Sequence, residues 1–154
     1  KPALGYLYVK DMLGDELFLK ALHFYIGQWN GKHPQPYDFF NAMNTGSGRN
    51  LNWFWQRWFF EDGYPDLGIA GVQQQNGEYA VTVEAVGTKP VPVDLVVTYA
   101  DGSTSTLHQD VSVWENGNRT TLLTFRPAKQ VQKLELRGTY VPDSNPANNV
   151  HEEK

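Results

Sequence analysis

Hydrophobic side chains between Asp15 and about Trp29 recur with the period of an α-helix. They fall at spacings of i, i+3, i+4, i+7 and i+11, occupied by Phe18, Ala21, Leu22, Tyr25 and Trp29. This stripe is typical of a helix that packs on one side. Gly14 and Asp15 provide a stop signal and a start signal in front of it.

The same period predicts three more helices before residue 66. One runs from Pro2 to about Asp11, with Pro2 in its first turn. The next is marked by Tyr37, Phe40 and Met43 and ends at the glycines of 46–48. We expect Asn50 to cap the last, whose main apolar face carries Leu51, Phe54, Trp55, Trp58 and Phe59.

From Asp66 onward the apolar period drops to two, which indicates strands with one buried face. About seven short strands follow, the number expected of an immunoglobulin-like sandwich. The clearest runs are 79–85, 93–99, 111–114, 121–125 and 131–136.

Three dipeptides between these runs predict tight turns. Asn76-Gly77 and Asp101-Gly102 each predict a hairpin with a type I′ turn, because both positions of such a turn need a positive φ. Asn116-Gly117 suggests a third hairpin. The segment from Pro142 has no periodicity, so we expect a surface loop that leads to a frayed end.

The predicted fold class is therefore α+β in two parts. An N-terminal bundle of about four helices occupies residues 1–65, and an antiparallel immunoglobulin-like sandwich of about seven strands occupies residues 66–154.

The amino-acid composition excludes some classes of binding partner for this chain. The chain has 154 residues, with 13 Lys and Arg against 17 Asp and Glu and a net charge of −4. This balance argues against nucleic acid as a partner, because proteins bind nucleic acid by neutralising its phosphates.

The absence of cysteine excludes disulfides and thiolate metal sites. No run of apolar residues reaches membrane-spanning length, so we expect no membrane partner. The chain begins at Lys1 without a leader, and we interpret it as a piece of a longer protein.

The four histidines do not form a metal-binding pattern. A helical zinc site places two histidines at i and i+4, and His23, His33, His108 and His151 are far apart in the sequence. His151-Glu152 opens a His-Glu-x-x-His pattern, but the chain ends at Lys154. We therefore interpret it as a charged tail.

Other polar residues also favour structural roles. Asp38 with Asp15 or Glu16 would make a carboxylate pair, but helix capping explains each of them better. The serines at 103, 105 and 112 have no nucleophile elbow, the glycines at 46–48 have no P-loop lysine, and most aromatic residues fall at core spacing. We assign no catalytic, cofactor-binding or metal-binding residue to this chain.

One set of segments is best read together, in chain order: residues 1–4, 13–18, 32–40, 53–55 and 63–66. In this order they resemble the bacterial branch of the aminopeptidase N family of zinc metallopeptidases, the gluzincins, and the resemblance is densest over residues 1–66. It is looser but collinear over the strands, through Pro142-Asp143 and Asn148-Asn149. It covers nearly the whole chain, although no single motif is diagnostic.

The resemblance implies that the working parts of the parent enzyme lie upstream. In such enzymes a His-Glu-x-x-His helix and a later Glu bind zinc, and a Gly-x-Met-Glu-Asn strand holds the substrate's amine. None of these motifs is present here. Lys1-Pro2 resembles the end of the family's Tyr-x-Lys-Gly segment, with Pro2 in place of Gly, which places the catalytic Tyr just before the chain.

The resemblance further implies a non-catalytic C-terminal portion, inactive alone, that buttresses the active-site domain. Zinc then belongs to the parent only, and the partners are the rest of the peptidase and its peptide substrate. The sequence does not give the parent's compartment; the resemblance favours a periplasmic or exported protein, with the cytoplasm as the alternative. We also expect the separated chain to self-associate through an apolar patch around Leu4, Leu7 or Tyr8.

A second interpretation is a stand-alone sandwich module that binds carbohydrate or protein, and a third is a structural adhesion segment. Exposed coplanar aromatic residues on the sandwich would favour the second. Burial of Trp53, Trp55 and Trp58 among helices would favour the peptidase fragment.

Overall fold

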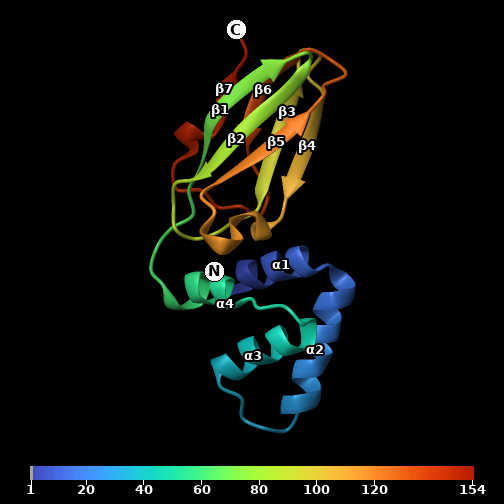
Figure 1. Cartoon of the computed structure of the whole chain (residues 1–154), viewed down its shortest axis with the longest axis vertical. Helices are drawn as coiled ribbons and strands as arrows, with labels where there is room; N and C mark the ends of the chain where they lie inside the picture. Colours follow the sequence, from blue (N-terminus) through green and yellow to red (C-terminus); the bar gives the residue numbers. More distant parts are fainter. Residues whose placement is uncertain (1) are drawn as a thin grey trace. The chain divides into compact units, whose positions relative to one another are not determined.

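The computed structural model describes residues 2–154. Its contacts divide the chain into two compact units, one ending at Asp62 and one from Gly63 to Lys154 (Figure 1). The first unit is helical, and the second holds seven antiparallel strands in two sheets. The two-part α+β fold class predicted from the periodicity is confirmed.

The helical unit contains the four predicted helical segments, close to their predicted bounds. They are α1 (Pro2–Leu13), α2 (Asp15–Trp29), α3 (Pro36–Ser47) and α4 (Asn52–Trp55), the last of which continues into the π-helix η1 (Gln56–Phe60).

The ends of these helices follow local chemistry. Gly14 separates α1 from α2 at a φ of 76°, and Gly48 ends α3 in the left-handed conformation. The Asp38 carboxylate accepts the backbone N–H of Gln35 at 2.7 Å, so this acid caps α3. Asn50 Oδ1 accepts the N–H of Asn52 at 3.0 Å at the start of α4. The capping role predicted for Asp38 is confirmed. Leu51 holds the N-cap position of α4, and Asn50, the residue before it, accepts the first N–H of the helix.

Aromatic rings form much of the core of the helical unit. Trp55 stacks on Phe40 with ring centroids 4.8 Å apart, and Tyr8 meets Trp58 edge to face at 5.4 Å. Trp55 and Trp58 are buried, as the peptidase-fragment interpretation expects, whereas Trp53 is only half-buried. Tyr8 is 3% exposed, so it was wrongly placed in the expected apolar patch. Leu7 is 45% exposed, and self-association through it stays a prediction.

The last helix departs from the expected regular period. Residues 56–60 form a π-helix, whose hydrogen bonds span five residues instead of the four of an α-helix, as in the bond from Glu61 N–H to the Gln56 carbonyl. Phe60, at the end of this segment, is 48% exposed and stacks on Tyr37.

Gly46 brings α3 against α2. A Cβ atom at this position would lie 2.7 Å from Ala21 Cα and 2.9 Å from Phe24 Cβ. We expect Gly46→Ala to lower the free energy of unfolding by about 1–3 kcal/mol, because the contact is with rigid backbone. Urea unfolding measures it.

Gly27 provides the matched control for Gly46. It also lies in a helix, and a Cβ atom there would meet nothing within 4 Å. Gly27→Ala should raise stability by roughly 0.5–1 kcal/mol through helix propensity alone. The close-approach explanation fails if both variants shift stability in the same direction.

The sandwich unit pairs its strands in the orders β1-β2-β5 and β4-β3-β6-β7, all antiparallel (Figure 1). Successive strands change sheet from β2 to β3, from β4 to β5 and from β5 to β6, as in sandwiches with crossing connections. Their bounds are β1 Leu67–Gln75, β2 Glu78–Ala85, β3 Val93–Tyr99, β4 Thr104–Gln109, β5 Thr120–Phe125, β6 Val131–Leu136 and β7 Val150–Glu152.

Alternate residues of the strands fill the core, as the period of two predicts. Val81 and Val83 of β2 are fully buried, as are Leu95 and Val97 of β3 and Leu134 of β6. The hydrophobic pattern therefore fixes which face of each strand is buried.

Both predicted hairpins are present, but one turn type was wrong. Asn76 and Gly77 have φ angles of 52° and 76°, which fits a type I′ turn. In the second hairpin only Gly102 is left-handed, at 82°. Its N–H donates to the carbonyl of Tyr99, and Tyr99 N–H donates to the carbonyl of Ser103. This is a type I turn followed by a glycine bulge.

The predicted strand over 111–114 and its hairpin were wrong. Residues Val111–Gly117 form the 3₁₀-helix η2, which starts where the Asp110 carboxylate accepts the N–H of Ser112 at 2.8 Å. Asn116 and Gly117 do have positive φ angles, but they lie at the end of η2, whose helical geometry is interrupted at Glu115 and Asn116. The side chain of Asp110 caps a helical turn here. Alternation over only four residues, 111–114, does not distinguish a strand from such a turn.

The predicted frayed end was also wrong. After the short 3₁₀-helix η3 (Pro146–Asn148), residues 150–152 form β7 and pair with β6 at the edge of the sheet. His151 and Glu152 are therefore strand residues. Three residues are too few for their alternation to stand out in the sequence.

Candidate functional site

The four histidines lie in separate places. His23 and His33 are exposed in the helical unit, and His151 Nε2 lies 3.6 Å from a Glu153 carboxylate oxygen in the sandwich. Over residues 2–154, no group of three or more His, Cys, Asp or Glu side chains is arranged to hold a metal ion. The expected lack of a cofactor stays a prediction.

His108 pairs with Asp94 across the β3–β4 ladder. The two residues are direct cross-strand partners, and Nδ1 of His108 lies 2.6 Å from Oδ1 of Asp94. The carbonyl of Asp94 also accepts the N–H of Arg137. Because the histidine side chain is 44% exposed and its partner is set by strand register, we interpret the pair as a cross-strand contact.

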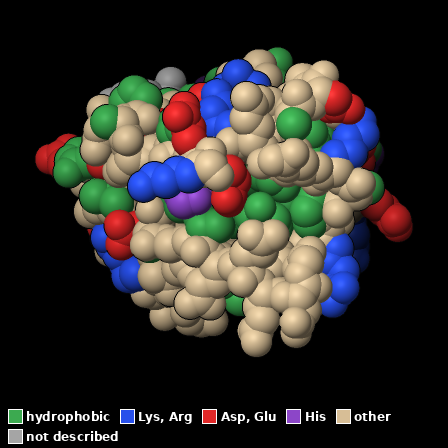
Figure 2. All heavy atoms as spheres, turned by 90° about the horizontal axis from the view of Figure 1, so that it is seen from above, with side chains coloured by type: hydrophobic (Ala, Val, Ile, Leu, Met, Phe, Trp, Pro, Cys, Tyr) green, Lys and Arg blue, Asp and Glu red, His purple; other side chains and the backbone are tan. Residues whose placement is uncertain are grey.

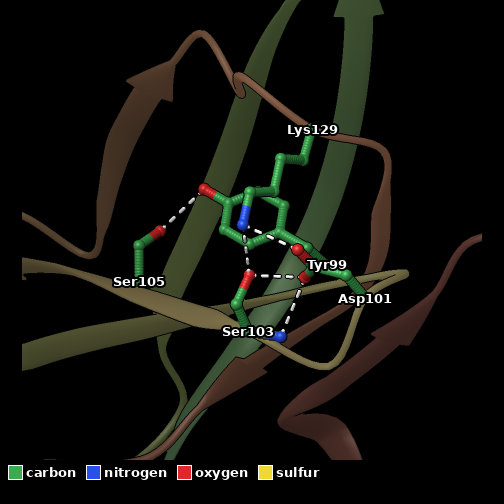
Figure 3. Close-up of polar contacts among 5 residues, drawn as sticks. All are labelled: Tyr99, Asp101, Ser103, Ser105 and Lys129. Carbon is green, nitrogen blue, oxygen red and sulfur yellow. Dashed lines mark hydrogen bonds and ion pairs between the residues drawn. The ribbon is translucent and has the colours of Figure 1, made fainter.

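A second polar cluster surrounds the β3–β4 hairpin (Figure 3). Lys129 Nζ donates to Asp101 Oδ2 at 2.7 Å and to Ser103 Oγ at 3.0 Å. Ser103 donates both its hydroxyl and its N–H to Asp101 Oδ1. Tyr99 Oη lies 2.8 Å from Ser105 Oγ, and the ammonium sits over the Tyr99 ring.

The pairing of Lys129 with Ser103 resembles a serine–lysine nucleophile, but its environment does not suit that chemistry. A lysine acts as a base only when its ammonium is destabilised, which requires burial or a nearby cation. Lys129 is 52% exposed and lies against a carboxylate. The hydrogen bond from Lys129 is the largest cause that holds the pKa of Asp101 well below its usual range, and the hydrogen bonds from Ser103 lower this pKa further. The cluster therefore holds the hairpin to the loop before β6.

We expect Asp101→Asn to lower the melting temperature at neutral pH and to flatten its acid dependence. A carboxyl group whose folded pKa is depressed stabilises the fold above its unfolded pKa, which is near 3.8. That contribution is lost as the pH falls toward the folded value. Wild type and variant should therefore differ above about pH 5 and converge in strong acid.

Thermal melts between neutral and strongly acidic pH measure this difference. Glu84→Gln is the control, since the described structure shows no ion pair for this exposed carboxylate. A constant offset between Asp101→Asn and wild type at every pH would contradict the pKa argument.

The closing segment of the chain is tied back to the first strand, which sequence analysis missed. Asp143 Oδ2 accepts the N–H of Leu67 at 2.9 Å, and Asn148 donates its amide to the buried Asp66 at 2.9 Å. These contacts join residues 76 and 82 positions apart. The sequence did carry a signal for these contacts, since Pro142-Asp143 and Asn148-Asn149 are the two segments that the resemblance singled out near the end of the chain. The structure shows that they hold this end against residues 66 and 67.

An open aromatic groove lies in the helical unit between α3 and the last helix. Its volume is about 350 Å³. Three side-chain amides and four aromatic rings line it, from Tyr37, Phe40, Asn41, Asn52, Trp55, Gln56 and Phe60. The sequence pattern placed most aromatic residues in the core, and it did not predict that Tyr37 and Phe60 of this groove remain exposed.

No protein-family profile and no curated protein matches the chain by sequence. A structural match is found to aminopeptidase A of Legionella pneumophila, crystallised in complex with aspartic acid. The match has a TM-score of 0.61 and 19% sequence identity over 80% of this chain. The chain therefore shares its fold with part of an aminopeptidase structure, and it spans only 14% of that protein's length.

The remaining features of the surface are general. In the part of the chain that the structure describes, no helix is both long and apolar enough to cross a membrane. Figure 2 shows a face on which basic and acidic side chains are interspersed with hydrophobic ones. A mixed surface of this kind offers no extended basic patch for phosphates there.

Proposed function

We propose that this chain is the non-catalytic C-terminal portion of a zinc-dependent aminopeptidase of the aminopeptidase N type. The observation that carries the proposal is the fold likeness to an aminopeptidase over 80% of the chain. The ordered resemblance of residues 1–66 supports it independently. The helical unit is then the end of the catalytic domain, and the sandwich unit is an immunoglobulin-like domain.

In this proposal the chain packs against the catalytic domain and supplies no catalytic residue. The parent hydrolyses N-terminal aminoacyl bonds with zinc and a glutamate from its upstream part. The helices of the present chain buttress that domain through apolar side chains such as Leu7, Leu19 and Ile26, which are 45%, 47% and 49% exposed. Burying such side chains against a partner domain is favourable in proportion to the area covered.

We expect the purified chain to bind no stoichiometric zinc and to leave aminoacyl-nitroanilides uncleaved. A hydrolytic zinc site needs about three clustered ligands, and no such group is found among residues 2–154. Metal analysis and the nitroanilide assay measure this, with an active zinc aminopeptidase as the positive control. One tightly bound zinc per chain together with turnover above background would contradict the proposal.

The coding sequence upstream of Lys1 tests the family directly. We expect a His-Glu-x-x-His motif followed by a later Glu. Its absence would favour the alternative function, a sandwich module that binds carbohydrate or protein. The sandwich unit exposes Tyr64 and Tyr140, at 55% and 64%.

A further inference from the structure

The groove of the helical unit has an aromatic floor and an aromatic wall. Phe40 and Trp55 are buried beneath it, at 5% and 2% exposure. Tyr37 and Phe60 remain 63% and 48% exposed and stack on each other, with centroids 5.0 Å apart and planes 12° from parallel. The stack holds the two rings nearly parallel, with one face of each turned toward the other, so a ligand meets the outer face of a preorganised ring.

The polar part of the groove consists of uncharged amides. Asn41, Asn52 and Gln56 are exposed at its rim. Asn52 Oδ1 already accepts from Asn44 at 2.7 Å, and Gln56 Nε2 donates to Glu61. The Asn41 amide has no hydrogen-bond partner among the described residues. The rim therefore offers both donors and acceptors without a formal charge.

We propose that this groove binds a short neutral carbohydrate. The apolar face of a sugar ring presents C–H bonds that suit the negative face of an aromatic ring, while its hydroxyl groups can both donate to and accept from side-chain amides. All seven lining residues are uncharged, which favours a ligand without charge. A volume of about 350 Å³ lies in the range of small-molecule sites.

Two features disfavour other ligands. A purely apolar ligand would bury the rim amides without giving them hydrogen bonds, which costs free energy. An extended peptide that pairs through its backbone needs an exposed strand edge, whereas the backbone groups of helices are already hydrogen-bonded within each helix.

The π-helix supports the site indirectly, because such helices occur often at functional positions and this one ends at Phe60.

This inference does not depend on the proposed peptidase origin, because the groove is formed within one unit of the chain. The two can therefore fail separately. Zinc analysis and the upstream sequence decide the origin, and sugar binding decides the groove.

The test is an NMR titration of the full chain with maltose, cellobiose and N,N′-diacetylchitobiose in separate experiments. We expect saturable shifts of the Trp55 indole and of the Asn41 and Asn52 amides with at least one of these sugars. Tyr37→Ala should weaken binding by about tenfold, the factor that corresponds to one lost aromatic contact. Tyr37→Phe keeps the ring and should retain binding.

Tyr140→Ala is the matched control, since this residue is equally exposed but belongs to the sandwich unit. It should bind as wild type does. A proline-rich peptide is titrated in parallel. The proposal is overturned if no sugar gives saturable shifts, if Tyr37→Ala binds as tightly as wild type, or if only the peptide binds at this groove.

Discussion

Replacing Trp55 with alanine is expected to lower the free energy of unfolding by about 3–5 kcal/mol. The side chain is 2% exposed and stacks on Phe40, and it also contacts the rings of Phe54 and Phe59. Its Nε1–H donates to Asn44 Oδ1 at 3.1 Å. Denaturant unfolding followed by circular dichroism in the helical region measures the loss.

Two variants separate the causes of that loss. Trp55→Phe keeps most of the ring but removes the hydrogen bond, and Asn44 Oδ1 still accepts the N–H of Leu51. It should therefore cost only about 1 kcal/mol. Leu19→Ala, at a site 47% exposed, should change stability by less than about 0.5 kcal/mol. Equal losses for Trp55→Ala and Leu19→Ala would show that Trp55 does not anchor the helical core.

Trp114→Ala should destabilise the sandwich unit by a similar amount, about 3–5 kcal/mol. The residue lies on η2 and is 1% exposed. Its Nε1–H donates to the carbonyl of Val91 at 2.8 Å, and this bond is buried. The alanine variant therefore leaves both a cavity and an unpaired carbonyl group.

Trp114→Phe isolates the hydrogen bond. It should cost about 1–3 kcal/mol, because a buried acceptor loses its partner while most of the ring volume remains. Thermal unfolding followed by near-ultraviolet circular dichroism compares the two variants. A phenylalanine variant as stable as wild type would show that water replaces the indole at the Val91 carbonyl.

Local patterns of the sequence anticipated the helices and the strand faces well. The bounds of α2 agree with the prediction because Gly14 and Asp15 mark its start and the apolar stripe marks its extent. The buried residues of β2 and β3 follow from alternation, since neighbouring side chains of a strand point to opposite faces.

Predictions that rested on short or ambiguous patterns failed. The alternation at 111–114 spans only four residues, and the Asp110 cap outweighs it. β7 has three residues, and only its pairing with β6 orders them. The type I′ turn was wrong because Asp-Gly also suits a type I turn with a glycine bulge, and the strand register decides between the two.

The two-part fold class can be predicted from the sequence, because helix and strand periods and capping signals are encoded by neighbouring residues. Which distant side chains meet depends on the packing of the elements. Lys129 reaches Asp101 across 28 positions because the loop before β6 lies beside the β3–β4 hairpin. Tyr37 of α3 and Phe60 at the end of η1 form an exposed stack across 23 positions. Such contacts depend on how elements pack in space, which no local period specifies.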